Sequence, residues 1–177
     1  MASNQDVNRM DLVEKTVNEL MGKYHNCAQC TLVGIQIVSG LKDDGLAKAS
    51  TGFAGGIGGM QSVCGALTGA VLALEMKYGR DISFLEGPPE AALKKQSEAT
   101  EQAARLAKWF EREFGTIICS ELRKSHMGTD LSMGVPWQNE WAEQLGMRKR
   151  CAEFAARTAR RALAMLDDPK LSIVEKI

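Results

Sequence analysis

The first apolar pattern of the chain repeats with the period of an α-helix. Between residues 7 and 24, apolar side chains return every three or four positions and polar or charged side chains fill the positions between them. This pattern predicts an amphipathic helix packed on a core. A second helix is predicted over residues 27–38, because Asn26 is a good N-cap residue and Ser39-Gly40 can end the helix. The β-branched residues near the end of this segment also fit a strand, so that alternative stays open.

A glycine-rich loop precedes the most apolar segment of the chain. Residues 52–59 hold five of the 17 glycines. Residues 61–78 are apolar on almost every side, which predicts a helix buried in the centre of the domain. Within this helix Gly65, Gly69 and Ala73 follow one another at intervals of four. A neighbouring helix can approach closely along such a stripe of small residues.

Two further helices are predicted after this central segment. Pro88-Pro89 marks the start of a long amphipathic helix, since proline fits the first turn, and Gly115 ends it. Thr116 can cap a short helix that contains Cys119.

A last long helix follows a predicted loop over residues 126–138. It starts near Gly146 and places Cys151 on the stripe that faces the core. Four arginines are expected outside this stripe: Arg148, Arg157, Arg160 and Arg161. Without internal repeats or alternating β-branched runs, the chain is predicted to be an all-α, single-domain bundle of five or six helices, with a core over about residues 8–166 and loosely attached ends.

Composition agrees with one globular domain that carries no bulk charge. The 177 residues are 45% hydrophobic and 25% charged, which suits a domain with a substantial core. Lys plus Arg and Asp plus Glu are each 22, so no net field attracts nucleic acid or an anionic membrane. Residues 1–15 lack the order of a secretory signal, and residues 64–74 are too few to span a bilayer. We therefore expect a cytoplasmic protein that neither binds nucleic acid nor inserts into a membrane.

Five cysteines raise the question of redox or metal chemistry. Structural disulfides are rare in a reducing cytosol, and an odd number cannot pair completely. Cys27, Cys64, Cys119 and Cys151 lie on four different predicted helices, and a helical bundle can bring such residues together. Three of them lie near helix starts, where the helix dipole favours the thiolate that binds metal. The alternative is a set of unrelated buried thiols that pack as small hydrophobic side chains.

Cys30 forms a CxxC pattern with Cys27. Neither the strand-turn-helix context of a thioredoxin nor the following histidine of a c-type haem site is visible. Cys30 is therefore interpreted as an ordinary helix residue, with an extra metal ligand or a resolving thiol as the alternatives.

The glycine-rich loop is a candidate cofactor-binding segment. Its N–H groups can donate to cluster sulfides or cysteine sulfurs. The residues predicted for this role are Gly55, Gly56, Gly58 and Gly59. Close helix packing explains the same glycines equally well, and the loop lacks the endings of phosphate-binding and dinucleotide-binding loops.

The histidines, arginines and methionines are weaker candidates for functional residues. His25 lies two residues before Cys27 and can be a ligand or a proton-transfer group, although a polar residue at a helix boundary is the commoner case. His126 is better interpreted as a residue at a helix end. The arginines of the last helix could meet an acidic redox partner, but a solvated face is more common. The nine methionines are scattered, which is more typical of core filling than of copper binding.

The order of the cysteine segments matches a known pattern. The segments are Asn26-Cys27-Ala28-Gln29, residues 53–58, Cys64-Gly65-Ala66-Leu67-Thr68-Gly69-Ala70, Cys119 and Cys151. In this order they resemble the C_GCAxxG_C_C family of redox-active proteins, defined by four cysteines and a CGAxxG motif, over about residues 8–160. The resemblance places the family cysteines on Cys27, Cys64, Cys119 and Cys151 and makes Cys30 an extra one. It implies a small prokaryotic redox-active protein, with related domains associated with an iron–sulfur centre, and it supplies no reaction.

Three hypotheses follow from the residues and the resemblance together. The leading one is an electron carrier whose four cysteines bind an iron–sulfur cluster, with a [2Fe–2S] cluster favoured. The second is a thiol-disulfide redox protein or sensor in which a pair such as Cys27 and Cys64 cycles. The third is a non-enzymatic helical interaction protein, a possible homodimer, whose cysteines only pack. The sequence leaves open whether the protein is an enzyme and which protein is its redox partner.

Overall fold

The computed structural model describes residues 4–129, 143 and 146–171, and this part of the chain is all-α. Its elements are α1 (Asn4–Tyr24), α2 (Cys27–Ser39), α3 (Asp44–Ala49), η1 (Ser50–Phe53), α4 (Gly65–Tyr78), η2 (Ile82–Leu85), α5 (Pro89–Phe114), α6 (Cys119–Met127) and α8 (Met147–Asp167), where η denotes a 3-10 helix. The predicted all-α single domain is confirmed. The described residues form seven α-helices rather than five or six, because the short α3 has no buried residue and so leaves no apolar stripe in the sequence.

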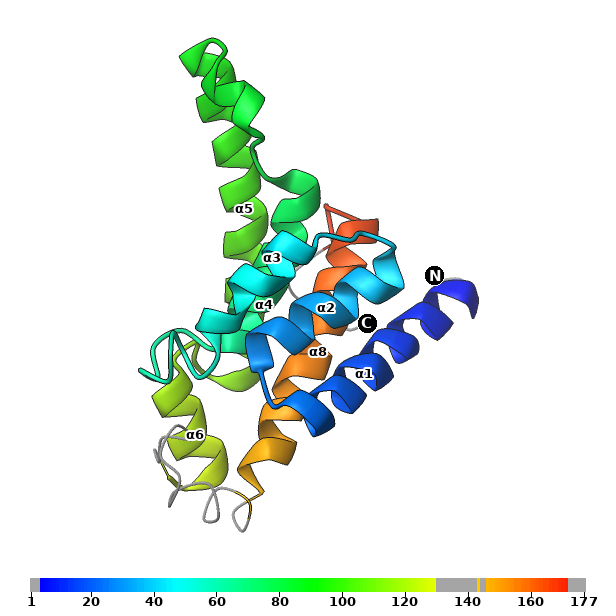
Figure 1. The fold of residues 1–177 in the computed structure, drawn as a ribbon, viewed down its shortest axis with the longest axis vertical. Helices are drawn as coiled ribbons and strands as arrows, with labels where there is room; N and C mark the ends of the chain where they lie inside the picture. Colours follow the sequence, from blue (N-terminus) through cyan, green and yellow to red (C-terminus); the bar gives the residue numbers. More distant parts are fainter. Residues whose placement is uncertain (1–3, 130–142, 144–145, 172–177) are drawn as a thin grey trace.

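The body of the molecule consists of α1, α2, α4 and α8, which pack against one another (Figure 1). α8 packs against α1, α2 and α4, and α2 contacts both α1 and α4. The fully buried side chains at these contacts include Val13, Val17, Leu32, Ile35, Leu74 and Leu163. The apolar spacing of residues 7–24 therefore marks the face of α1 that packs on the core, as predicted.

Both ends of α2 have the capping groups that the sequence predicts. The Asn26 side chain accepts a hydrogen bond from the Gln29 N–H at 2.9 Å. At the other end Gly40 has φ 81 and donates its N–H to the Gln36 carbonyl. An N-cap of this kind contributes about 0.5–2 kcal/mol. The alternative of a strand in this segment is wrong, since the helix continues to Ser39.

The small-residue stripe of α4 lies against α2, which confirms the predicted close approach of a neighbouring helix. A Cβ at Gly69 would lie 2.9 Å from the carbonyl carbon of Ala28, closer than real Cβ atoms come to backbone. Ala73, one turn further on, is fully buried. Glycine at position 69 therefore sets the distance between the two helices.

The segments that precede α4 and α6 are extended rather than helical. Val63 and Ile118 form an antiparallel β-bridge. The central helix therefore starts at Gly65, and the prediction that it starts at residue 61 is wrong. Thr116 does not cap α6 either. Its hydroxyl accepts a hydrogen bond at 3.1 Å from the N–H of Ile118, and Ile118 is itself the residue before the first residue of α6. Helical periodicity is a local signal and cannot reveal a bridge between such distant segments.

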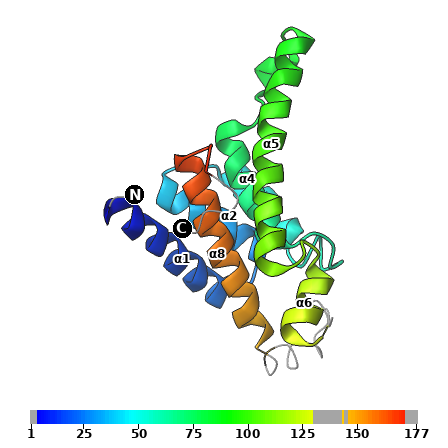
Figure 2. The same cartoon turned by 180° about the vertical axis from the view of Figure 1, so that it is seen from behind.

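α5 is a 26-residue helix with the start and end predicted from Pro88-Pro89 and Gly115. It packs against α4, and Figure 2 shows that its N-terminal half extends, with η2, away from the other helices. Large apolar side chains are exposed there: Ile82, Leu85 and Leu93. No helix in the described ranges is both long and apolar enough to cross a membrane.

The formation of a homodimer by this protein remains a prediction.

α8 follows Gly146 as predicted, but one of its arginines lies in the core. Arg161 is 1% exposed, and its guanidinium lies over the Trp109 ring, 5.6 Å from the ring centre. The expectation that Arg161 lies outside the apolar stripe is therefore wrong, because an aromatic ring on α5 covers its cation. Arg160 pairs with Asp11 on α1 at 2.7 Å. Of the predicted loop, residues 130–138 lie outside the described part of the chain.

Candidate four-cysteine site

A cavity of about 380 Å³ lies where α2, α4, α6 and α8 begin. Its lining residues are Met21, His25, Cys27, Ala54, Gly55, Gly58, Gly59, Cys64, Cys119, Arg123, Arg148, Cys151 and Phe154. The structure thus brings the four cysteines singled out from the sequence into one cavity. Cys64 and Cys119 are buried, whereas Cys27 and Cys151 are partly exposed.

Helix starts place three of the four cysteines. Cys27 is the first residue of α2, Cys64 is the N-cap residue of α4, and Cys119 is the first residue of α6. Cys151 lies just beyond the first turn of α8. Helix N-termini carry partial positive charge and unpaired N–H groups, so each contributes about 0.3–1 kcal/mol toward a nearby negative charge. The helix starts therefore contribute a field at the cavity that stabilises negative charge.

The β-bridge holds Cys64 and Cys119 beside each other. The Cys64 N–H donates to the Ile117 carbonyl at 2.8 Å, and the Cys119 N–H donates to the Ser62 carbonyl at 2.7 Å. Each cysteine directly follows a residue of the bridge, and α4 and α6 both start next to the bridge. Main-chain hydrogen bonds thus fix the relative position of two cysteines far apart in the sequence.

Gly65 makes room for the Cys27 sulfur. A Cβ at this position would lie 2.9 Å from the Phe53 carbonyl oxygen and closer still to Cys27 Sγ. Only glycine therefore allows the start of α2 to contact the start of α4. This contact places Cys27 directly beside the residue that follows Cys64.

The glycine-rich loop adopts an unusual backbone conformation. Residues 55–59 all have positive φ, and Ile57 is the one among them that is not glycine. Gly56 closes the loop, since a Cβ there would lie 2.5 Å from the Ser62 nitrogen. The N–H groups of Gly58 and Gly59 donate to the Gly52 and Ala54 carbonyls at 2.8 and 3.0 Å.

These hydrogen bonds bear on the predicted cofactor-binding role of the loop. Gly55, Gly58 and Gly59 line the cavity, whereas Gly56 is buried and is not among the lining residues. The N–H groups of Gly58 and Gly59 are engaged inside the loop, so they shape the cavity wall in this conformation rather than donate into it. Cofactor binding by Gly55, Gly56, Gly58 and Gly59 stays a prediction.

Two arginines line the cavity, a position that was not predicted from the sequence for either of them. Arg123 lies four residues after Cys119 and is 3% exposed. Arg148 lies three residues before Cys151 and pairs with Glu143 at 2.6 Å. Residues three or four apart share a helix face, so the spacing from each cysteine is the signal that could have identified them. Two permanent positive charges therefore face the four sulfurs.

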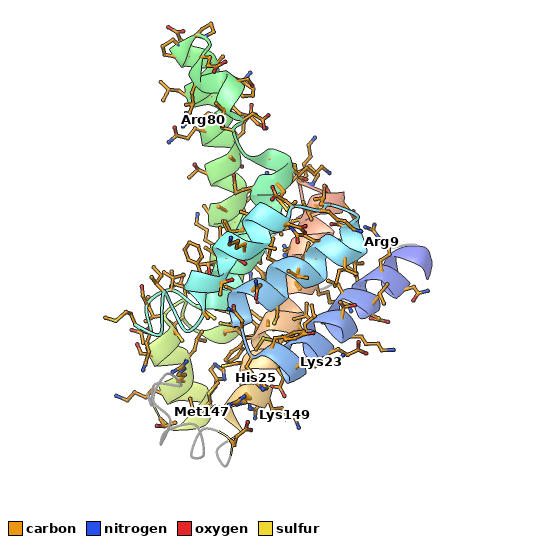
Figure 3. The ribbon with its side chains drawn as sticks, in the orientation of Figure 1. Arg9, Lys23, His25, Arg80, Met147 and Lys149 are labelled. Atoms are coloured by element: carbon orange, nitrogen blue, oxygen red, sulfur yellow. The ribbon has the colours of Figure 1, made fainter. Side chains whose placement is uncertain are left out.

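His25 lies at the junction of α1 and α2, where Figure 3 shows it on the side of the molecule where α8 begins with Met147. Its φ is 55, its side chain is exposed, and it lines the cavity. A proton-transfer role for His25 at the cavity stays a prediction. His126, in contrast, directs Nε2 to the Phe114 carbonyl at 2.9 Å.

Burial keeps three of the four thiols protonated in the metal-free protein. It raises the pKa of Cys64 well above the usual thiol value, and charge on Cys27, Cys119 or Cys151 raises it further. Burial also raises the pKa of Cys119, with the Arg123 charge and hydrogen bond acting in the opposite direction. For Cys151, burial raises the pKa to about 12. A metal that binds these sulfurs must therefore displace protons.

The metal-free protein is expected to lose stability at alkaline pH. Between the ordinary thiol pKa of 9.0 and the value of about 12 for Cys151, the unfolded chain has lost a proton that the folded chain keeps. The contribution of Cys151 to the free energy of unfolding is thus fully present below pH 9.0 and lost as the pH rises toward 12. Urea unfolding of the reduced protein at several pH values measures this loss, and Cys151→Ala should show a shallower decline. An unchanged decline in the variant would contradict the assignment.

Cys30 lies next to this site but outside the cavity lining. It is 3% exposed and belongs to the apolar core. Burial raises its pKa, and a charge on Cys27 raises it further. Cys30 is therefore a neighbour of Cys27 and does not belong to the described residues that line the cavity.

The four cysteines do not surround a single point in the described structure. Among residues 4–129, 143 and 146–171, no three His, Cys, Asp or Glu side chains form a group that could hold one metal ion. The four cysteines instead line a cavity of about 380 Å³, three of them from helix starts and Cys151 from just beyond the first turn of α8.

An all-α domain with four cysteines around one cavity defines a helical protein with a thiol-lined site. Comparison with protein families then assigns the chain. The family model described as "Putative redox-active protein (C_GCAxxG_C_C)" matches residues 25–165. The chain therefore belongs to this family, and the resemblance inferred from the sequence is confirmed. No curated protein and no solved structure matches the chain.

Proposed function

We propose that the protein is an electron carrier whose four cavity cysteines, Cys27, Cys64, Cys119 and Cys151, bind one iron–sulfur cluster, with [2Fe–2S] as the favoured type. The observation that supports this proposal is the common cavity, which is lined by all four sulfurs. Membership of a redox-active family agrees with it. When bound, such a cluster supplies one-electron transfer at a potential set by its protein environment.

The donor set of the cavity fits this cluster. A [2Fe–2S] cluster takes four cysteine thiolates, two for each iron, so its ligands need not surround one point. Cys64 and Cys119 are held by the bridge, and Cys27 and Cys151 lie on helices that pack against each other. The cavity is also deep enough to bury two of the sulfurs while two remain partly exposed. The partial exposure of Cys27 and Cys151 gives a redox partner a short path to the site.

The charges around the sulfurs suit a negatively charged group. Three helix N-termini and the cations of Arg123 and Arg148 face the cavity. A cluster bound by four thiolates is an anion in both redox states and gains negative charge on reduction. Arg123, which hydrogen-bonds to Cys119, is the buried cation best placed to compensate this charge.

Replacement of Arg123 by glutamine is expected to lower the reduction potential, because the reduced cluster loses a nearby positive charge. Arg123→Lys should retain most of the wild-type potential. Potentiometric titration followed by visible absorption measures the difference. Arg160→Gln is the matched control, since Arg160 pairs with Asp11 on α1 and is not among the described cavity residues. Equal potentials in Arg123→Gln and wild type would contradict this role.

Anaerobic purification and reconstitution test the proposal itself. The protein is expected to hold about two iron and two sulfide per chain and to absorb in the visible range as a thiolate-bound cluster. Colourless protein without stoichiometric iron, after reconstitution with iron and sulfide, would rule the proposal out. A metal-free protein with a reversible Cys27–Cys64 disulfide would instead support the thiol-disulfide alternative.

A further inference from the structure

Cys27 has a thiol neighbour outside the cavity, in addition to the cysteines that line the cavity with it. It is the first residue of α2, and Cys30 lies one turn further along the same helix. Cys27 is partly exposed, whereas Cys30 is buried at 3% exposure. The pair thus consists of one partly exposed cysteine, which a reagent can reach, and one buried cysteine on the same helix.

We propose that Cys27 and Cys30 form a reversible disulfide, and that this bond competes with the cavity for the Cys27 sulfur. The disulfide is independent of the proposed function. Its consequence, loss of one cluster ligand on oxidation, rests on that function.

The geometry of a first helical turn allows this bond. Cβ atoms three residues apart on a helix are separated by about 5–6 Å, and a disulfide needs about 3.5–4.5 Å. A shift of about 1–2 Å at the start of α2 is therefore sufficient. Cys27 is the first residue of the helix, directly after Asn26 and the positive φ of His25, whereas Cys30 lies inside the helix and donates its N–H to the Asn26 carbonyl at 2.8 Å. Cys27 is the residue that moves.

A disulfide of Cys27 with Cys64 or Cys119 would join two different elements of the fold. Cys64 is the N-cap residue of α4, and the distance between α2 and α4 is set by Gly69 against the Ala28 backbone. Cys119 is held by main-chain hydrogen bonds to the bridge. The Cys27–Cys30 pair needs no movement of one helix against another.

The reaction is thiol-disulfide exchange with a low-molecular-weight disulfide as the oxidant. The Cys27 sulfur attacks the reagent disulfide, forms a mixed disulfide and releases one thiol. The Cys30 sulfur then attacks the Cys27 sulfur and releases the second thiol. Two protein thiols lose two electrons and two protons, and the reagent disulfide gains them to become two thiols. Excess thiol reverses both steps.

Trypsin separates the cysteines in a way that makes the test direct. Residues 24–42 form one tryptic peptide that contains Cys27 and Cys30 and no other cysteine. Cys64, Cys119 and Cys151 fall on the separate peptides 49–77, 113–123 and 151–157. An internal disulfide makes peptide 24–42 lighter by two hydrogens and blocks both of its alkylation sites, whereas any other pairing links two peptides.

The experiment equilibrates metal-free full-length protein in buffers of oxidised and reduced glutathione, traps thiols by alkylation in denaturant, and maps the peptides by mass. Peptide 24–42 is expected to convert to the internal disulfide as the buffer becomes oxidising and to return to the dithiol in reducing buffer. In Cys30→Ala the same peptide should instead carry a glutathione adduct on Cys27. Alkylation of Cys30 at every buffer ratio, or a link from peptide 24–42 to another peptide, would overturn the proposal.

The competition is tested separately by repeating the series after reconstitution. Wild-type protein with bound cluster should resist formation of the disulfide, whereas Cys64→Ser, which lacks a proposed ligand, should form it with or without the reconstitution step. Equal disulfide formation in cluster-bound and metal-free wild type would overturn the competition. If no cluster assembles at all, the proposed function fails, and the metal-free series still decides whether the disulfide forms.

Discussion

Cys64→Ser is expected to reduce cluster loading by about tenfold or more, since it removes a ligand and not merely an outer partner of the site. Cys64 is the N-cap residue of α4 and makes no side-chain capping hydrogen bond. Serine is among the preferred residues at this position, so the fold should be retained or slightly stabilised. The loss of loading can therefore be assigned to the sulfur. Iron and sulfide content after identical reconstitution measures it.

Cys30→Ala is the matched control for this variant. Cys30 is also buried, but it lies in the apolar core and not among the described cavity residues. Its replacement should leave the iron content of the reconstituted protein near the wild-type value. If Cys64→Ser loads as well as Cys30→Ala, Cys64 is not a ligand.

Gly69→Ala is expected to destabilise the protein by about 2–3 kcal/mol, in the upper part of the range for overpacked cores. The added Cβ would meet the backbone of Ala28, which cannot move aside as a flexible side chain can. α2 must then move away from α4, and Cys27 moves with it relative to Cys64. Both the free energy of unfolding, measured by urea denaturation, and cluster loading should fall.

Gly22→Ala is a matched substitution on an open helix surface. Gly22 lies in α1, and a Cβ there would meet nothing within 4 Å. Alanine is favoured over glycine in a helix by about 0.5–1 kcal/mol, so this variant should be more stable than wild type. A Gly69→Ala variant that is as stable as Gly22→Ala would show that the small-residue stripe does not set the spacing of α2 and α4.

Local signals in the sequence predicted most of the helices. Asn26 and Gly40 marked the ends of α2, and Pro89 and Gly115 marked those of α5, because caps and breakers act on their immediate neighbours. Gly69 predicted a close helix contact because a residue without a side chain lets the backbone of a neighbouring helix approach. The identity of the partner helix could not be predicted, since it depends on packing across the whole domain.

The parts of the site that were missed depend on contacts between distant segments. The bridge between Val63 and Ile118 joins two short extended pieces, each of which reads as part of a helix when taken alone. Arg161 was expected in solvent because its charge is visible in the sequence and the Trp109 ring that covers it is not. Arg123 could have been found from its spacing to Cys119, but its burial could not.

The central claim is that Cys27, Cys64, Cys119 and Cys151 hold one cluster together. Iron K-edge X-ray absorption of the reconstituted protein tests this claim most directly, because it reports which elements are bound to iron. A first shell of sulfur alone is expected in wild type and in Cys30→Ala, and an added oxygen or nitrogen ligand in Cys64→Ser. A wild-type first shell dominated by oxygen or nitrogen, with the four cysteines still open to alkylation, would contradict it.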